Sequence, residues 1–134
     1  MGAVLVDSNI LLDLFDTGSE WFSWSRDALR IAAERSNLVI NPVIYAEISV
    51  GYDGIEMVDA LLPPFLQREP ISFEAAFLAG KAYQIYRRRG GPRRSPLPDF
   101  FIGAHAAVAG YEILTRDAAR YRTYFPGLKI TAPD

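Results

Sequence analysis

Four acidic residues hold positions at which their carboxylates could act together. Asp7 directly follows a short apolar run, and Asp117 lies three residues beyond a second one. Glu47 and Asp99 lie in two stretches with helical periodicity. Carboxylates that share a pocket repel one another, and a bound divalent cation removes this conflict. Because the chain has no cysteine and one histidine, the available ligands are hard oxygens, which suit Mg²⁺ or Mn²⁺ better than zinc.

The elements that must position these acids follow from the hydrophobic pattern. Short runs that are apolar throughout predict buried strands at 3–6, 38–40 and 111–114, and the stretches 65–71 and 128–131 are compatible with two more. Helical periodicity and helix-start residues predict helices at 10–15, 20–35, 42–50, 55–62, 72–89 and 98–109, and after Thr115. Strands that alternate with helices predict an α/β fold in three layers, with a mostly parallel central sheet flanked by helices.

A parallel sheet would bring the acids to one edge. Ligands of open α/β sheets bind beyond the carboxyl ends of the strands, near the point where the strand order reverses. Asp7 and Asp117 are expected on that edge, and Glu47 and Asp99 could lean over it. One or two cations held there can activate water and offset the charge on a phosphodiester.

Spacing alone leaves a plainer interpretation equally open. Asp99 could simply be a helix-start acid, and Thr115 is expected to cap a helix with Asp117 in its first turn, where the helix dipole favours an acid. The surface or a capping position is also the expected place for the remaining acids, including Asp13, Asp16, Asp27 and Asp59.

Composition limits the class of protein. The 134 residues, half of them hydrophobic, predict one domain over 1–134 with a substantial core. The first acid, at position 7, comes too early for a signal peptide, and no apolar run approaches the length of a membrane span. The lack of cysteine fits a reducing cytoplasm.

The net charge of −2 argues against a surface that is basic all over, so any contact with nucleic acid must be local. The candidate RNA contacts are five closely spaced arginines: Arg87, Arg88, Arg89, Arg93 and Arg94. Guanidinium groups pair well with phosphate oxygens. The same cluster could instead be a solvated helix end that complements the dipole, or could meet an acidic protein.

Other conspicuous residues are expected to serve packing. His105 lies six positions after Asp99, off its helix face, so we assign it a packing or interface role and no chemistry. Trp21 and Trp24 are helical neighbours typical of a core. Gly103 and Ala106 would allow close packing of their helix.

Four segments, taken together, resemble the motifs of PIN domains. Residues 4–12 (VLVDSNILL) resemble the opening strand motif, and 44–48 (IYAEI) look like the family's glutamate helix. Residues 97–106 (LPDFFIGAHA) resemble the third acidic motif, and 114–117 (LTRD) the last one, followed by an aromatic residue at 121, 124 or 125. Each segment alone is weakly specific, but all four occur in order over nearly the whole chain.

The resemblance implies a PIN fold and a metal-dependent ribonuclease that uses Mg²⁺ or Mn²⁺. Its acidic, metal-binding and catalytic residues would be Asp7, Glu47, Asp99 and Asp117. Ser8, Asn9 and Thr115 would orient carboxylates or water. A free-standing domain of this size looks most like VapC-type toxins, which usually form homodimers and are silenced by a small antitoxin protein. We therefore expect an RNA substrate, an antitoxin and a second copy of the chain as partners, and no membrane.

Several alternatives remain to be compared with this hypothesis. A phospho-acceptor receiver domain would need an acceptor Asp where Asn41 stands, and a phosphatase of the aspartyl-phosphate type would carry Asp-x-Asp instead of Asp7-Ser8-Asn9. A non-catalytic binding module of the same fold would usually have lost one of the four acids. A DNA nuclease of the same fold stays open.

Overall fold

Five strands form a single sheet in which every described pair is parallel. The computed structural model describes residues 2–92 and 97–133. The strand order is β3-β2-β1-β4-β5. The strands are β1 (Ala3–Val6), β2 (Asn37–Ile40), β3 (Leu66–Arg68), β4 (Glu112–Leu114) and β5 (Ile130–Thr131). The predicted α/β class and mostly parallel sheet are thereby confirmed.

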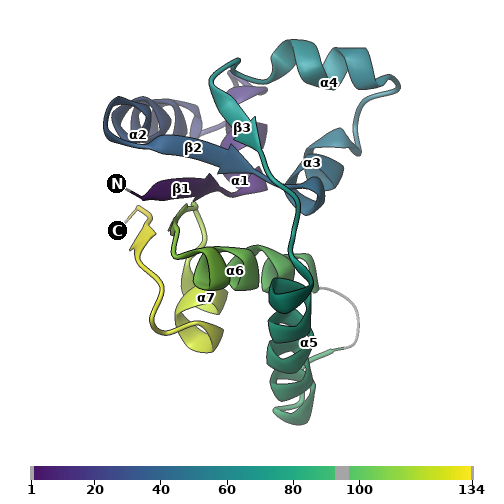
Figure 1. The fold of residues 1–134 in the computed structure, drawn as a ribbon. Helices are drawn as coiled ribbons and strands as arrows, with labels where there is room; N and C mark the ends of the chain where they lie inside the picture. The colour runs from purple at the N-terminus through teal and green to yellow at the C-terminus, as the bar shows by residue number, and fades with distance from the viewer. Residues whose placement is uncertain (1, 93–96, 134) are drawn as a thin grey trace.

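Helices cover both faces of the sheet and make the fold three-layered. They are α1 (Ser8–Leu14), α2 (Phe22–Arg35), α3 (Pro42–Ser49), α4 (Ile55–Leu61), α5 (Phe73–Arg88), α6 (Leu97–Ala109) and α7 (Ala119–Tyr124). The helices α1 and α2 pack together on one side of the strands, and α6 and α7 lie on the other side (Figure 1). The helix α5 packs against α6 and extends away from the sheet.

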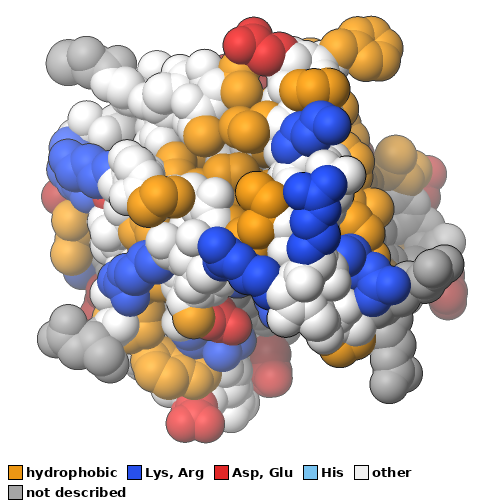
Figure 2. All heavy atoms as spheres, turned by 90° about the horizontal axis from the view of Figure 1, so that it is seen from below, with side chains coloured by type: hydrophobic (Ala, Val, Ile, Leu, Met, Phe, Trp, Pro, Cys, Tyr) orange, Lys and Arg blue, Asp and Glu red, His pale blue; other side chains and the backbone are white. Residues whose placement is uncertain are grey.

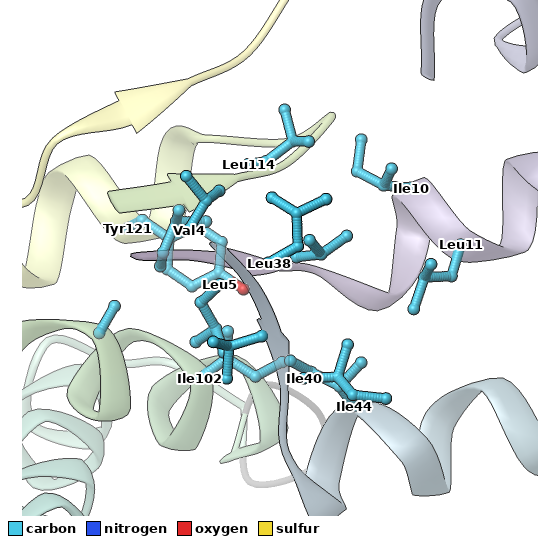
Figure 3. Close-up of a cluster of buried hydrophobic side chains, with 14 of the residues drawn as sticks. Val4, Leu5, Ile10, Leu11, Leu38, Ile40, Ile44, Ile102, Leu114 and Tyr121 are labelled. Carbon is cyan, nitrogen blue, oxygen red and sulfur yellow. The ribbon is translucent and has the colours of Figure 1, made fainter. Parts of the chain in front are cut away.

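The core lies between these layers and is built mainly from the strands. Leu5 and Val39 are fully buried, because strands of a parallel sheet are covered on both faces. Figure 3 shows how side chains from β1, β2, α1, α3 and α6 converge, with Tyr121 of α7 among them. The buried apolar runs of the sequence therefore form the strands that position the acidic residues.

Local sequence signals explain where several helices begin and end. The Asn41 side chain accepts a hydrogen bond of 2.9 Å from the Ile44 N–H and caps α3, with Pro42 in the first turn. Gly110 follows α6 with φ 75°, which allows the Tyr111 N–H to bond the Ala106 carbonyl at 2.9 Å. The chain thus turns directly from α6 into β4.

The prediction that Thr115 caps a helix is wrong. The helix α7 begins at Ala119, its capping position is Ala118, and its first turn contains no acid. The Thr115 hydroxyl instead donates to the Asp7 carboxylate at 2.8 Å. Asp117 therefore lies in the segment between β4 and α7.

Two further expectations differ from the structure. The helix expected from residue 20 begins at Phe22, with Trp21 as its N-cap. Asp13, expected at the surface, is buried, and Arg116 binds it through Nε at 2.8 Å and Nη2 at 3.1 Å. A charged partner from a distant part of the chain makes this burial tolerable.

None of the helices formed by residues 2–92 and 97–133 combines the length and the apolar character needed to cross a membrane.

The order of the strands creates a switch point between β1 and β4. From β1 the chain adds β2 and β3 on one side, and then crosses over to add β4 and β5 on the other. The carboxyl ends of β1 and β4 are neighbours, as the hydrogen bond of 2.9 Å from the Asp7 N–H to the Leu114 carbonyl shows. In open α/β sheets this is the preferred place for a ligand.

Candidate active site

Asp7 is held tightly at the carboxyl end of β1. Its side chain is buried and caps α1 by accepting a hydrogen bond of 2.7 Å from the Ser8 N–H at Oδ1. The hydroxyl groups of Thr115 and Tyr121 both donate to Oδ2 at 2.8 Å. Three donors from three parts of the chain therefore orient one carboxylate.

Glu47 reaches the same region from α3. Its Oε1 accepts a hydrogen bond of 2.8 Å from the Ser8 hydroxyl, whose oxygen is also 3.4 Å from Asp7 Oδ1. Ser8 thus lies between the two carboxylates and links the helix that starts at Asp7 to the helix that carries Glu47.

Asp99 lies in the first turn of α6, as predicted, and is paired with a cation. Arg120 of α7 binds Asp99 Oδ2 through Nη1 at 2.7 Å. Both side chains are about one-third exposed, at 37% for Arg120 and 33% for Asp99. This ion pair therefore borders solvent, whereas Asp7 lies beneath the surface.

Asp117 is exposed and is held through its backbone. Its N–H donates to the Thr115 hydroxyl oxygen at 3.1 Å. Asn9 bonds the same segment twice, through its Nδ2 to Thr115 Oγ1 at 3.2 Å and through its Oδ1 to the Arg116 N–H at 3.1 Å. Ser8, Asn9 and Thr115 are thus all in contact with the segments that carry the acids.

The four acids influence one another electrostatically. Burial raises the pKa of Asp7, and the nearby Asp99 raises it further, against the hydrogen bonds that lower it. Burial likewise raises the pKa of Glu47, with Asp7 and Asp99 adding to the effect. Burial also raises the pKa of Asp99, as does Asp117, while Arg120 lowers it. Asp7, Glu47 and Asp99 thus form one electrostatic cluster, to which Asp117 is connected through Asp99.

The donors in this cluster fit a hard divalent cation. Carboxylate oxygens are the ligands that Mg²⁺ and Mn²⁺ prefer, and a cation would offset the burial and the mutual repulsion that raise the pKa values of Asp7 and Glu47. Across the described residues, however, no three acidic or histidine side chains are arranged as a complete set of ligands. The carboxylates are instead engaged by Ser8, Thr115, Tyr121 and Arg120.

The structure describes three of the five arginines that were predicted to contact RNA. Arg87, Arg88 and Arg89 are exposed at the end of α5, whereas Arg93 and Arg94 lie outside the described residues. The Arg87 guanidinium donates to the Gly91 carbonyl at 2.6 Å, which fits the end of a helix. Arg89 lies over the ring of Tyr124 at 5.4 Å from its centroid and so faces α7.

His105 is buried in a separate polar network, in agreement with a packing role. Its Nδ1 lies 2.9 Å from Asn41 Nδ2, and its Nε2 lies 3.5 Å from Glu69. Burial lowers its pKa, and Glu69 opposes the effect. Because Asn41 caps α3, this network joins α3 to α6, the two helices that carry Glu47 and Asp99.

Sequence reasoning missed Arg120, and it named Tyr121 only as one of three aromatic residues that could complete the last motif. Burial and the neighbouring carboxylates hold the pKa of Tyr121 well above its usual value, so the phenol stays protonated and donates to Asp7. The two residues follow Asp117 by three and four positions, and a search for polar residues just after the last acid could have suggested them.

A cavity of about 510 Å³ lies away from these acids, at the amino ends of the strands, where Ala3, Glu112 and Lys129 line it. None of the four acids lines it. The electrostatic cluster, and not this hollow, is therefore the better candidate site.

Comparison with known proteins assigns the chain to a family. The model of the PIN domain family matches residues 4–126, nearly the whole chain. A search among curated proteins gave no significant match.

Solved structures with the same fold come from bacterial toxin–antitoxin systems. A chain from a toxin–antitoxin complex of Klebsiella pneumoniae is 26% identical, with a TM-score of 0.68 over 98% of both chains. A chain from VapBC2 of Rickettsia felis, bound to a promoter DNA fragment, is 17% identical, with a TM-score of 0.76 over 98% of this chain and 99% of that one. VapC20 of Mycobacterium tuberculosis, described as a toxin that cleaves the sarcin–ricin loop, is 15% identical, with a TM-score of 0.63 over 90% and 95%.

The match over residues 4–126, together with this shared fold, shows that the chain belongs to the PIN domain family.

Proposed function

We propose that this chain is a divalent-metal-dependent endoribonuclease and the toxin of a toxin–antitoxin pair. One observation carries the nuclease proposal. Asp7, Glu47, Asp99 and Asp117 come from four separate segments and form one cluster beside the β1–β4 switch point, where three of their pKa values are raised. Ionising such a cluster costs free energy unless a cation offsets the charges of the carboxylates.

The comparisons support the class of reaction and the biological setting. The chain is a PIN domain, and VapC20, which shares its fold, is described as a toxin that cleaves the sarcin–ricin loop of RNA. The Klebsiella structure, at 26% identity, is a toxin–antitoxin complex. RNA is therefore preferred over DNA as the proposed substrate.

Each residue of the cluster would have a distinct role in this reaction. Asp7, Asp99 and Asp117 would hold the cation, and Glu47 would hold it or the attacking water. A bound Mg²⁺ or Mn²⁺ would activate water and offset charge on the phosphodiester. Ser8, Thr115 and Tyr121 fix the orientation of the carboxylates. No side chain forms a covalent intermediate in this proposal.

Purified wild type and Asp99→Asn should be compared on a mixed pool of single-stranded RNA and DNA, each with Mg²⁺, Mn²⁺ or EDTA. We expect RNA cleavage by wild type that needs the cation and is lost in Asp99→Asn, because a ligand of the cation is removed. Asp27→Asn is the matched control, since Asp27 is an acid away from the cluster whose side chain is 47% exposed and pairs with Arg26 and Arg30.

Other outcomes of this experiment would contradict the proposal. Equal RNA cleavage by wild type and Asp99→Asn would place the activity elsewhere. Cleavage of DNA alone would establish the DNA nuclease of the same fold. A folded wild type that binds RNA or protein without cutting any nucleic acid would favour the non-catalytic module.

The proposed protein partners are a small antitoxin and a second copy of the chain. Exposed apolar side chains on α4 and α5 support this, among them Ile55 at 61%, Phe73 at 95% and Phe77 at 67%. Light scattering of the purified chain tests the homodimer, which a mass of one chain would contradict. A short reading frame for a DNA-binding protein next to the gene would identify the antitoxin.

A further inference from the structure

The guanidinium of Arg120 lies directly on one of the four acids. Its Nη1 is 2.7 Å from Asp99 Oδ2, which is a strong, charge-assisted contact. Both side chains are about one-third exposed, at 37% and 33%. Ion pairs that border solvent contribute little net free energy, so this pair can exchange partners at small cost.

Arg120 is also the first member of a strip that leads away from the acids. Its Cζ lies 5.7 Å from the centre of the Tyr86 ring, and that ring lies 6.1 Å from the ring of Tyr124. Arg89 lies over the other end, with its Cζ 5.4 Å from the Tyr124 ring centre. The two tyrosine rings thus lie between the two arginines, and Tyr124 is half-buried whereas Tyr86 is buried.

The surface on this side of the molecule has the composition that such a strip requires. Figure 2 looks from below at the side toward which α5 and α7 extend in Figure 1, and it shows Lys and Arg side chains interspersed with hydrophobic ones. A basic surface binds the phosphates of single-stranded nucleic acid, and partly exposed aromatic rings such as that of Tyr124 can stack on its bases. The chain as a whole is acidic, so this local surface stands out.

A cation and Arg120 need the same carboxylate. Asp99 is paired with Arg120, and the nearby Asp117 raises its pKa. Asp99 in turn raises the pKa values of Asp7 and Glu47. We propose that Arg120 pairs with Asp99 only until a divalent cation binds the acids, and that its guanidinium then pairs with a phosphate of the RNA strand. Arg120 is in this proposal a substrate-binding residue whose availability depends on the cation.

The geometry gives the freed guanidinium a short path to the substrate. Arg120 already lies beside the acids, so a phosphate placed there is within reach of its long side chain. The fork of the guanidinium matches two phosphate oxygens. The proposal rests on the nuclease function proposed above, because it needs both the cation and the RNA strand.

The first measurement is Mn²⁺ binding to the RNA-free protein by calorimetry. Arg120→Gln is expected to bind Mn²⁺ several-fold more tightly than wild type, because the cation no longer displaces a guanidinium from Asp99. Arg122→Gln is the matched control. It removes the same charge from an exposed position on the same helix, and wild-type affinity is expected.

The second measurement is binding of a labelled single-stranded RNA by fluorescence anisotropy, with Ca²⁺ or with EDTA. In Ca²⁺, Arg120→Gln is expected to weaken RNA binding by about tenfold, the effect of one lost charge-assisted contact. In EDTA the loss is expected to be small, because wild-type Arg120 then stays on Asp99. Arg122→Gln should act equally in both conditions, and a gel confirms that the RNA stays intact.

A third variant and a folding check keep the test decisive. Arg120→Lys keeps the charge without the fork, so Mn²⁺ affinity near wild type and an intermediate loss of RNA affinity are expected. Thermal unfolding establishes that each variant is folded.

Two different failures can be told apart. If wild type binds Mn²⁺ and Arg120→Gln matches it in Mn²⁺ affinity, or loses RNA affinity equally with and without cation, the role of Arg120 is refuted and the nuclease proposal stands. If wild type itself binds no divalent cation, Asp99→Asn will show the same absence of Mn²⁺ binding. Both the nuclease proposal and the role of Arg120 are then refuted.

Discussion

Thr115 has one hydroxyl group that serves three neighbours in the cluster. It is fully buried, donates to Asp7 Oδ2 at 2.8 Å, and accepts from the Asp117 N–H at 3.1 Å and from Asn9 Nδ2 at 3.2 Å. The bond that Thr115 donates to Asp7 orients a carboxylate, and the two that it accepts fix the segment that carries Asp117. At this scale the candidate site depends on neutral groups as much as on the acids themselves.

Thr115→Val keeps the shape of this side chain and removes its hydroxyl. We expect RNA cleavage to fall about 10- to 100-fold, as for other residues that orient metal ligands. The free energy of unfolding should fall by about 1–3 kcal/mol, because buried polar partners lose their bonds. Thr115→Ser restores the hydroxyl and should recover most of the cleavage. A Val variant with wild-type cleavage would show that the hydroxyl plays no part.

Among the elements, α3, α6 and α7 must keep fixed relative positions, since they carry Glu47, Asp99 and the donors to Asp7. The contact of Asn41 with His105 ties α3 to α6. The helix α6 in turn packs closely on the end of α7. A Cβ built on Gly103 would lie 2.4 Å from Cε2 of Phe125, whose ring is buried and cannot move aside freely.

Gly103→Ala is therefore expected to lower the free energy of unfolding by about 1–3 kcal/mol, the usual cost of overfilling a packed core. Urea unfolding measures this change. Gly80→Ala is the matched control, because Gly80 is an exposed residue within α5 and an added Cβ meets nothing within 4 Å. Alanine there should raise stability by about 0.5–1 kcal/mol. Equal effects of the two substitutions would contradict the close packing of α6 on α7.

For the whole molecule, the acidic cluster makes the free energy of unfolding depend on pH. The pKa values of Asp7, Glu47 and Asp99 are raised in the folded protein, mainly by burial. The folded state therefore holds these protons more tightly than the unfolded state. The resulting contribution to stability is present below the ordinary carboxyl pKa of about 4, and it is lost as the pH rises through the raised values.

Glu47→Gln removes one of these charges. Comparison with wild type therefore isolates the contribution of Glu47 to the pH dependence of stability. In EDTA, the free energy of unfolding of Glu47→Gln is expected to rise relative to wild type between pH 4 and pH 8, when both are measured by urea unfolding. Mg²⁺ should stabilise wild type at pH 8 and reduce that difference, because it binds the folded state. Exposed Glu34→Gln should show neither effect. A constant difference between Glu47→Gln and wild type across this range would refute the coupling.

Much of this protein could be predicted from the sequence because the decisive signals are local. Apolar runs predicted β1, β2 and β4, Asn41 and Pro42 predicted the start of α3, and the position of Asp7 after a strand predicted its place at the sheet edge. The tertiary structure decided which side chains meet. It buried Asp13 against Arg116, turned the Thr115 hydroxyl to Asp7 instead of a helix, and set Arg120 on Asp99. These partners lie 103, 108 and 21 residues apart. Periodicity reports only on neighbours along the chain, so contacts made by packing distant elements appear only in the folded molecule.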